Sequence, residues 1–361
     1  MRPSRRWDTF KEMRTLSRTR NDLSDLLGIE GIVTLDPFES KALSDNPLGD
    51  RSDRPLGVYT PPQYDPEGSK RYPVLYLLHG YTGDLAGVIG TRLWEKNVVQ
   101  RLDRLIVSKK MPPALLVVID GVTRLGGSQY VNSIHNGDYA TYVVHETLAH
   151  VDANYRTIPR PEGRGVLGKS TGGFGSLYLT MNYPGHFGAF ASHSGDSYFR
   201  MCQVKSLLTC GRILEKYASL EQFVEAFEAK EKPKFEEVST MEMLAYAAAY
   251  SPTAAKAFAF DLPIDMKTGA FRDDVWERWL AFDPTEQIPR KRDELAALRL
   301  RYIDCGRRDE YGLDIGARVM AQQIRDLGLE VRHEEFDDDH MRIGYRYDVS
   351  LPALVEVLDR E

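Results

Sequence analysis

GRGVLGKSTGGFGSLYLTMNY, at residues 163–183, is the stretch that decides the fold this sequence predicts. Its start, GRGVLG, indicates a short strand that ends at a Gly-rich turn, and the following pattern predicts a helix over 171–182. Residues 168–172, GKSTG, fit the pattern G-x-S-x-G, a sharp strand-to-helix turn that exposes a strained serine. The glycines on either side of the serine leave room for such a turn. We therefore expect Ser170 to be a nucleophile.

Short apolar runs alternate with helical patterns on both sides of this stretch. The runs YPVLYLLHG (72–80) and PPALLVVIDG (112–121) are almost entirely apolar, as expected of strands buried on both faces of a parallel sheet. Other strands are predicted at 55–62, 163–168, 187–195, 298–306 and 330–336, and helices at 138–153, 171–182, 314–327 and 346–360. This alternation predicts βαβ units around a mostly parallel sheet with helices on both faces.

Two segments depart from the alternation. Residues 1–50 are predicted to form an N-terminal arm, which is rich in arginine at its start and lacks the apolar core of a secretory signal. Residues 51–361 are then expected to form one domain. Between about 200 and 297 the pattern is mainly helical, so we expect an insertion that packs over one edge of the sheet. A lid over a site and a plain structural elaboration are both open interpretations of this insertion.

Composition and charge narrow the class of protein. The chain has 361 residues, 42% of them hydrophobic, and a formal net charge of −6, which gives no basic footprint for nucleic acid. No apolar run reaches the ~20 residues of a membrane-spanning helix. Three cysteines make no disulfide framework, so we expect a cytoplasmic protein with reduced thiols, with a Cys202–Cys210 bridge left open. The sequence also leaves open whether the protein forms a homo-oligomer.

The serine turn matches a second pattern as well. Gly163, Gly168, Lys169 and Ser170 satisfy G-x-x-x-x-G-K-[ST], the loop that cradles phosphate in nucleotide-binding proteins. Such a loop needs its strand before the first glycine, but the residues there, YRTIPRPE, are polar and include two prolines. The strand lies inside the pattern instead. Nucleotide binding is therefore the weaker alternative.

A nucleophilic serine needs a general base. After a turn of this kind, the partners follow along the chain in the order acid, then histidine. Only His333 and His340 lie well downstream of the serine. His333 falls within the predicted strand 330–336, whereas His340 lies in the loop that follows it, where an open parallel sheet places its chemistry. We predict His340 as the base.

Asp309 is the candidate for the acid that orients the base. It lies three residues beyond the predicted strand 298–306, in the loop RRDEYGLD. Glu310 competes with it. Asp304 is expected to lie within the strand, and Asp314 to open the next helix as a cap or dipole partner. The role predicted for Asp309 is to hold the imidazole tautomer and to stabilise the imidazolium.

Backbone amides are expected to bind the negative charge that develops on a substrate oxygen. One amide belongs to Thr171, the residue after the nucleophile. The other is expected in the loop after the strand 72–80, where Tyr81 is the candidate and Gly80 permits the turn. We also expect Gly80 and Lys169 to lie against the substrate.

These segments together resemble the bacterial putative-esterase family of α/β-hydrolases, which includes S-formylglutathione hydrolases, feruloyl esterases, enterochelin esterases and mycolyltransferases. The stretches that carry the resemblance are RPLGVYTPPQYDP (54–66), YPVLYLLHGYTGD (72–84), GVLGKSTGGFGS (165–176), YPGHFGAFASHSGD (183–196), IDCGRRDEYGLD (303–314) and FDDDHMRIGYRYD (336–348). The resemblance implies the α/β-hydrolase fold. It also places Ser170, Asp309 and His340 on the family's triad positions, and Tyr81 and Thr171 on its oxyanion-hole positions.

The chain departs from the family pattern at two positions beside the expected site. Lys169 stands where many members carry histidine or glutamate, and Asp339 stands where a glycine precedes the catalytic histidine. These departures, with the long insertion, concern the choice of substrate rather than the chemistry.

The expected function is a serine carboxylesterase that acts on a small-molecule ester through an acyl-enzyme intermediate. An acyltransferase would use the same groups with an alcohol in place of water, and a hydrolase-like binding protein without activity is a further alternative. No organic cofactor is expected. No metal is expected either, because His145 and His150 are five positions apart, whereas a zinc-binding helix needs histidines at i and i+4.

Overall fold

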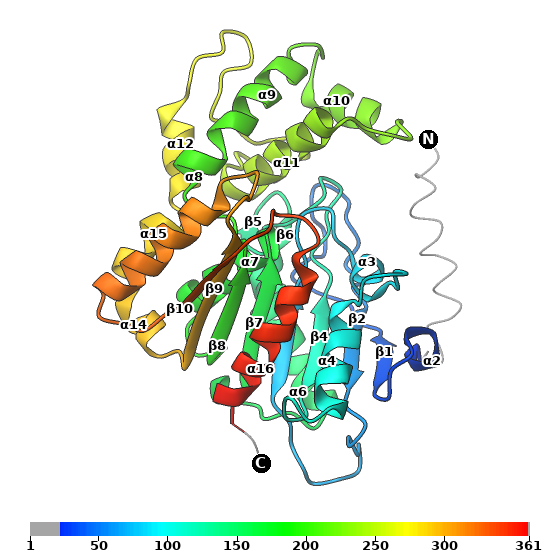
Figure 1. The fold of residues 1–361 in the computed structure, drawn as a ribbon. Coiled ribbons are helices and arrows are strands. Elements are labelled where there is room, and N and C mark those ends of the chain that lie inside the picture. The colour runs from blue at the N-terminus through cyan, green and yellow to red at the C-terminus, as the bar shows by residue number, and fades with distance from the viewer. Residues whose placement is uncertain (1–21, 360–361) are drawn as a thin grey trace.

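A twisted, mostly parallel sheet forms the centre of the molecule (Figure 1). The computed structural model describes residues 22–359. Within them the sheet has eight strands in the order β1-β2-β4-β3-β7-β8-β9-β10. β1–β2 and β2–β4 are antiparallel pairs and the other neighbours are parallel. The strands are β1 Ile32–Asp36, β2 Leu56–Thr60, β3 Val74–Leu78, β4 Leu115–Ile119, β7 Arg164–Lys169, β8 Ala189–His193, β9 Leu300–Gly306 and β10 Arg332–Phe336.

Helices cover both faces of this sheet, which explains why its central strands are apolar throughout. Every residue of β2, β3 and β4 is buried. Successive side chains of β3 point to opposite faces: Leu75 and Leu77 pack with α4 (Val98–Val107) and α16 (Tyr347–Val357). Tyr76 and Leu78 pack with the helices of the other face, including α6 (Leu148–Asn154), α7 (Thr171–Asn182) and α15 (Leu313–Asp326). The α/β-hydrolase fold predicted from the sequence is confirmed.

Short elements complete the first half of the chain. A small two-stranded ladder joins β5 (Asn132–Ser133) and β6 (Gly137–Asp138). The helix predicted at 138–153 is present, but its middle is a π-helical turn at Tyr142–Thr147, which separates α5 from α6. The other short helices are α2 Ser24–Leu27, α3 Leu85–Ile89 and α5 Tyr139–Thr141.

Part of the predicted N-terminal arm lies in the sheet. β1 is the edge strand, and its register pairs Ile32 with Thr60 and Asp36 with Leu56. The sequence of β1, IVTLD, gives only a weak strand signal, because four of its five residues stay partly or fully exposed at the sheet edge. Residues 1–21, which hold the Arg-rich start of the arm, lie outside the described residues.

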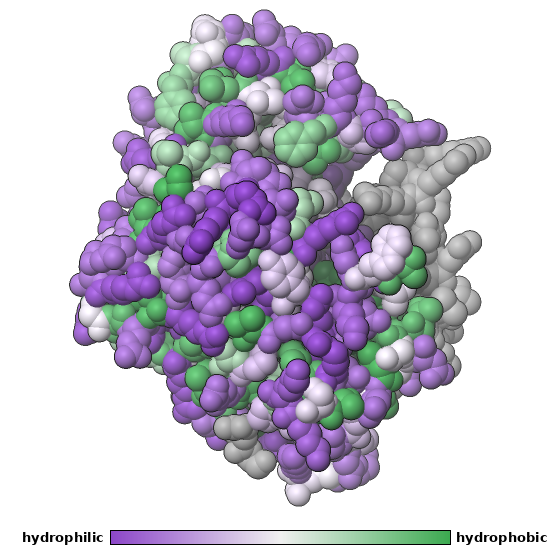
Figure 2. Space-filling model, viewed as in Figure 1, coloured by the Kyte–Doolittle hydropathy of each residue, from purple (hydrophilic) through white to green (hydrophobic). Residues whose placement is uncertain are grey.

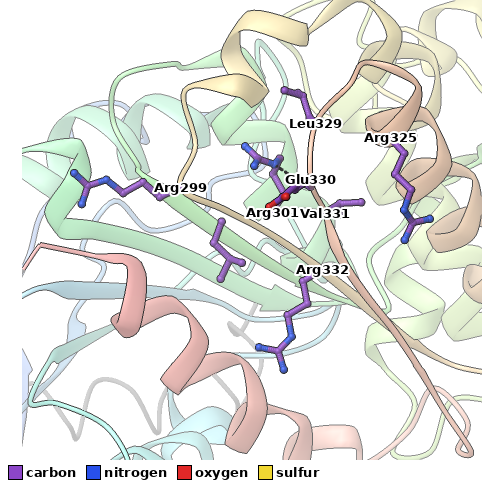
Figure 3. A pocket seen from close by; sticks show the side chains of 8 residues that line it. Arg299, Arg301, Arg325, Leu329, Glu330, Val331 and Arg332 are labelled. Atoms are coloured by element: carbon purple, nitrogen blue, oxygen red, sulfur yellow. Dashed lines mark hydrogen bonds between the residues drawn. The ribbon is translucent and has the colours of Figure 1, made fainter.

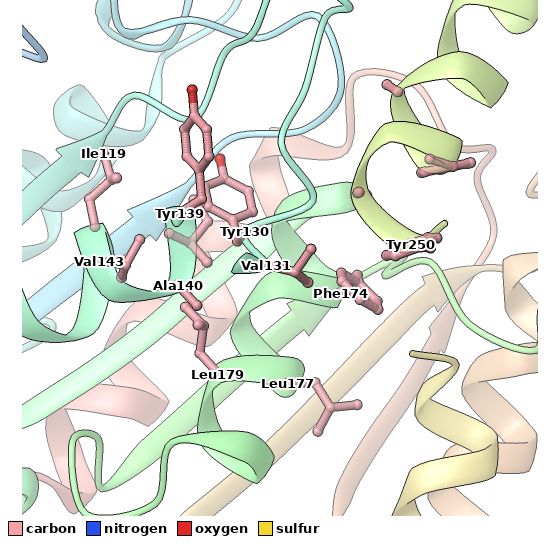
Figure 4. Close-up of a cluster of buried hydrophobic side chains, with 14 of the residues drawn as sticks. Ile119, Tyr130, Val131, Tyr139, Ala140, Val143, Phe174, Leu177, Leu179 and Tyr250 are labelled. Atoms are coloured by element: carbon pink, nitrogen blue, oxygen red, sulfur yellow. The ribbon is translucent and has the colours of Figure 1, made fainter. Parts of the chain in front are cut away.

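Residues 199–296 are mainly helical, as predicted for the insertion. Residues 199–280 lie over the carboxyl ends of the strands, whereas α14 (Arg292–Ala296) lies beside the sheet, near the start of β9 (Figure 1). Their core is continuous with that of the sheet. Tyr250 of α11 lies beside Phe174 of α7, with ring centroids 6.0 Å apart (Figure 4). The fully buried Trp279 donates its indole N–H to Ser251 Oγ at 2.8 Å. The helices are α8 Phe199–Cys202, α9 Val204–Leu214, α10 Leu220–Glu228, α11 Phe235–Tyr250, α12 Asp273–Leu280, α13 Pro284–Gln287 and α14 Arg292–Ala296.

The described part of the chain, residues 22–359, has no helix that is both long and apolar enough to cross a membrane.

A buried polar network ties α16 to β8 and β9. Asp304 on β9 accepts hydrogen bonds from Arg346 Nε and from the Tyr302 hydroxyl, each at 2.8 Å. His193 Nδ1 on β8 lies 2.7 Å from Asp304 Oδ1, and its Nε2 lies 2.8 Å from Ser350 Oγ on α16. Burial alone would raise the pKa of Asp304, but His193 and Arg346 hold it below its ordinary value. Asp304 is therefore a structural anion within the sheet.

We predict that Asp304→Ala lowers the free energy of unfolding by about 3–5 kcal/mol. It removes the buried acceptor of His193 and of the Tyr302 hydroxyl, while Arg346 keeps a single ion pair among the described residues, with Glu334. Urea unfolding measures the loss. Asp337→Ala is the matched control, since Asp337 pairs with Arg308 on the surface, and it should cost less than about 1 kcal/mol. Equal losses for the two variants would contradict this account of the network.

Candidate active site

Ser170 sits at the turn between β7 and α7 with a strained backbone. Its φ is 58° and its ψ is −126°, a region that residues with a side chain rarely adopt. The turn is held from both sides, because the Ser170 N–H donates to the His193 carbonyl at 2.9 Å and its own carbonyl accepts from the Phe174 N–H at 2.9 Å. The predicted strand–turn–helix is therefore present. A phosphate loop is excluded here, since β7 occupies the residues that such a loop would need.

The glycines around the serine are required by close backbone contacts. A Cβ on Gly172 would lie 2.0 Å from the Leu78 carbonyl oxygen of β3, and a Cβ on Gly168 would lie 2.4 Å from the backbone of Gly172. Atoms cannot approach to these distances without displacement of the backbone. A Cβ on Gly80 would meet Ser170 Cβ at 3.3 Å. Glycine therefore lets β3, β7 and the start of α7 meet closely enough to place Ser170 beside the loop after β3.

His340 and Asp309 form a close, buried pair in the loops after β10 and β9. His340 Nδ1 lies 2.7 Å from Asp309 Oδ2, and the Asp309 side chain is fully buried. The other carboxylate oxygen accepts the Tyr311 N–H at 3.0 Å. Burial opposes ionisation of Asp309, yet the hydrogen bonds from His340 and Tyr311 hold its pKa below the ordinary value. Asp309 therefore remains an anion beside the imidazole.

The loop around His340 holds the imidazole ring in place and leaves its Nε2 for a substrate. The His340 N–H donates to Glu310 Oε2 at 2.9 Å, and the Tyr311 ring contacts the imidazole edge-on with centroids 4.8 Å apart. Because Nδ1 is engaged by Asp309, Nε2 is the nitrogen that can act on a substrate. His340 and Ser170 line the same pocket, which has a volume of about 260 Å³.

The other candidates for the acid and for the base make different contacts. Asp304 belongs to the His193 network, and Asp314 pairs with Arg318 one helical turn along α15. Glu310 contacts His340 only through the backbone amide of the histidine. His333 is on β10, and its Nε2 has no hydrogen-bond partner among residues 22–359.

The Ser170 hydroxyl points toward a carboxylate that the sequence analysis did not single out. Ser170 Oγ lies 3.5 Å from Asp196 Oδ1, at the limit of a hydrogen bond, and within the described residues it makes no hydrogen bond to His340. Such catalytic contacts are often long before substrate binds and tighten in the complex. Asp196 lies just beyond the carboxyl end of β8, so its position relative to the strand was the signal available in the sequence.

The amides of Tyr81 and Thr171 are available for an anion. Within residues 22–359, neither N–H donates a hydrogen bond to another group. The Tyr81 hydroxyl donates to the Leu125 carbonyl at 2.8 Å, which anchors its loop. His79 Nε2 accepts the Gly121 N–H at 2.8 Å, so its Nδ1 carries the proton and donates to the Gly80 carbonyl at 2.9 Å. His79 thus ties the loop that carries Tyr81 to Gly121.

Lys169 lies at the end of β7 and, like Gly80, lines the pocket. Burial lowers the pKa of its ammonium group, while the negative charges of Asp309 and Asp196 oppose that effect. These carboxylates surround Lys169 without a close ion pair among the described residues. The positive charge of Lys169 is therefore balanced by carboxylates of the protein itself.

The outer wall of the pocket comes from the insertion. Phe235, Glu242 and Tyr246, all on α11, face Ser170 and His340 across the cavity. Figure 2 shows the surface hollowed between the insertion helices and the region of α3. The sequence analysis named none of these three residues, because the pattern of this helix indicates only that it is buried.

A larger cavity, of about 460 Å³, lies at the opposite end of the sheet, at the start of β9 and β10 (Figure 3). Its arginines point in different directions, and Arg301 is already engaged, with Nε donating to the Glu330 carbonyl at 2.5 Å. It holds no nucleophile. The smaller pocket at Ser170 is therefore the candidate active site. In the described part of the chain, no group of three or more His, Cys, Asp or Glu side chains could hold a metal ion.

Comparisons with known proteins identify the family and the fold. The model of the family described as "Putative esterase" matches residues 51–350, which confirms the resemblance inferred from the sequence. A Mycobacterium tuberculosis protein named as an esterase is 31% identical over 171 residues, which are 45% of this chain and 32% of that protein. The chain thus spans about a third of the length of this relative.

Two solved structures share the fold. A ferulic acid esterase superposes with a TM-score of 0.57 at 20% identity, covering 91% of this chain and 98% of the other. An S-formylglutathione hydrolase from Agrobacterium tumefaciens gives a TM-score of 0.56 at 14% identity, covering 92% of this chain and 97% of the other.

We predict that Gly172→Ala destabilises the protein by about 3 kcal/mol or more, because the new methyl group would force β3 and α7 apart. Thermal and urea unfolding measure the loss. Gly344→Ala is the control, since a Cβ there meets no atom within 4 Å, and its change should stay within about 0.5 kcal/mol. A Gly172→Ala protein as stable as the control would mean that the close contact with Leu78 is not required.

Proposed function

We propose that this chain, which belongs to the putative esterase family, is a serine carboxylesterase that cleaves a small carboxylic ester through an acyl-enzyme intermediate. The observation that carries the proposal is the convergence of three features in one pocket. They are a serine on a strained turn, a histidine paired with a buried carboxylate, and two backbone amides that find no acceptor among residues 22–359. One amide belongs to Tyr81 on the pocket wall and the other to Thr171, next to the serine.

The proposed reaction begins when Ser170 Oγ attacks the ester carbonyl carbon. His340 Nε2 takes the hydroxyl proton, while Asp309 holds Nδ1 and stabilises the imidazolium. The negative charge on the carbonyl oxygen is bound by the amides of Tyr81 and Thr171. The carbon–oxygen bond to the alcohol then breaks, and His340 gives its proton to the leaving oxygen. This step leaves an acyl group on the serine.

Water completes the cycle by the same route. His340 takes a proton from the water as its oxygen attacks the acyl carbon, the two amides again bind the oxyanion, and the proton returns to Ser170 as the acid leaves. Every proton in both steps is carried by His340. The residues of the pocket therefore suffice for the proposed chemistry.

The size and lining of the pocket support a small substrate. A volume of about 260 Å³ lies below the range of ~300–1,000 Å³ that is usual for sites of drug-sized ligands. Both polar and apolar side chains line the wall. The similar proteins include one named for ferulic acid and one for S-formylglutathione, so the fold accepts different acyl and leaving groups. The substrate of this chain is proposed only as a small carboxylic ester.

We predict that His340→Gln lowers kcat/KM for short acyl esters by about 10³–10⁴-fold, because the serine then has no base. His333→Gln is the matched control, being the other downstream histidine, and should change kcat/KM by less than about two-fold. Spectrophotometric hydrolysis of 4-nitrophenyl acetate gives both values.

Two outcomes would count against the proposed function. Equal activity of the two variants would remove His340 from the reaction. Diversion of the acyl group to an added alcohol in preference to water would identify an acyltransferase instead.

A further inference from the structure

A hydrogen-bonded chain leads from the insertion to the nucleophile. The Tyr246 hydroxyl of α11 donates to Asp196 Oδ2 at 2.8 Å. The same oxygen accepts the Thr171 hydroxyl at 3.2 Å, and the other oxygen lies 3.5 Å from Ser170 Oγ. At the far end, Glu242 Oε1 lies 3.4 Å from the Tyr246 hydroxyl oxygen. The chain therefore links Glu242 to Ser170 through Tyr246 and Asp196.

Counting hydrogens shows which state of Glu242 completes this chain. The Tyr246 hydroxyl has one hydrogen, and the shorter contact assigns it to Asp196. Glu242 can then bond the Tyr246 oxygen only by donating, which requires a protonated carboxyl group. An ionised Glu242 would instead compete with Asp196 for the same hydrogen. The intact chain thus runs from a neutral Glu242 to an anionic Asp196.

The surroundings of Glu242 favour the neutral form. Burial and the negative charge of Asp196 together raise the pKa of Glu242 to about 8, although the hydrogen bond with Tyr246 opposes this rise. Burial also raises the pKa of Asp196, against the hydrogen bonds from Tyr246 and Thr171. The titratable groups that face Glu242 are Tyr246 on α11, Asp196 after β8, Tyr81 after β3, Cys202 on α8 and Tyr311 after β9.

We propose that Glu242, Tyr246 and Asp196 form a positioning relay, in which the proton on Glu242 keeps Tyr246 bonded to Asp196 and so holds the Ser170–Thr171 turn in its reactive geometry. This inference rests on the proposed function of Ser170. It gives the insertion a role in the reaction, because two members of the relay belong to α11. Glu242 and Tyr246 act on the serine only through Asp196, whose Oδ1 lies 3.5 Å from Ser170 Oγ.

The relay predicts a decline of activity in alkaline solution. As pH rises through the pKa of Glu242, the carboxyl group loses its proton and Tyr246 faces two carboxylates with one hydrogen. The added negative charge also opposes the negative charge that develops on the substrate oxygen beside Thr171. If a histidine base alone controlled the rate, kcat/KM would instead rise with pH to a plateau, because the imidazole must be neutral to accept a proton.

The test is the pH profile of kcat/KM for 4-nitrophenyl acetate, corrected for spontaneous hydrolysis, in the full-length protein. For the wild type we expect a fall of about ten-fold between about pH 7 and about pH 9, as a single group with a pKa of about 8 requires. In Glu242→Gln we expect kcat/KM to stay level over this range, because the glutamine amide remains a neutral donor at every pH. Glu236→Gln, at an exposed carboxylate on the same helix, should keep it.

Tyr246→Phe gives a second test, which does not depend on the fall of kcat/KM at alkaline pH. Removal of its hydroxyl leaves Asp196 without its nearest donor, so kcat at neutral pH should fall about five-fold or more while KM stays within about two-fold. Melting curves confirm that each variant is folded before its rates are compared.

A fall that persists in Glu242→Gln, which Lys169 could produce by losing its proton, would overturn the relay. An unchanged kcat in Tyr246→Phe would overturn it as well. Both results leave the proposed esterase standing, because the wild type is active in each. Absence of any turnover in a folded wild-type protein would instead contradict the proposed function, and the relay with it.

Discussion

The close approach of Gly172, at the start of α7, to Leu78, at the end of β3, is the constraint on which the rest of the site depends. It is so close that a Cβ on Gly172 would lie 2.0 Å from the Leu78 carbonyl oxygen. It brings the turn that carries Ser170 against the loop that follows β3. That loop supplies the Tyr81 amide, and the turn supplies the Thr171 amide. One packing contact therefore sets the distance between the nucleophile and both candidate oxyanion donors, and the positive φ of Ser170 follows from fitting a side chain into so tight a turn.

Two histidine–aspartate pairs lie at the carboxyl ends of β8, β9 and β10, and the contacts of the second ring nitrogen separate their roles. His193 pairs with Asp304, and its Nε2 is bonded to Ser350 in the core, so the ring has no atom left for a ligand. His340 pairs with Asp309, and its Nε2 has no partner among residues 22–359 while the ring lines the pocket. The first pair stabilises the sheet. The second has the geometry of a general base with its orienting acid.

The sequence was sufficient for the features that depend on local pattern. Apolar runs located the buried strands, and the glycine spacing located the serine turn, because both follow from backbone geometry. β1 escaped notice, since an edge strand shows little burial. Glu242 and Tyr246 also escaped, because they meet Ser170 only after a helix far along the chain folds over the pocket. Asp196 was missed although it lies just beyond β8. Tyr246 lies in the run MLAYAAAY, whose composition indicates a buried helix and nothing about a site.

The central claim of this account is that Ser170 is an activated nucleophile, and covalent labelling tests it most directly. The folded protein is treated with a fluorophosphonate, digested, and mapped by peptide mass spectrometry alongside Ser170→Ala. We predict one adduct, on the peptide that contains Ser170, and its loss in the variant. A folded protein that forms no adduct, or that carries the adduct on a different serine, would contradict the claim.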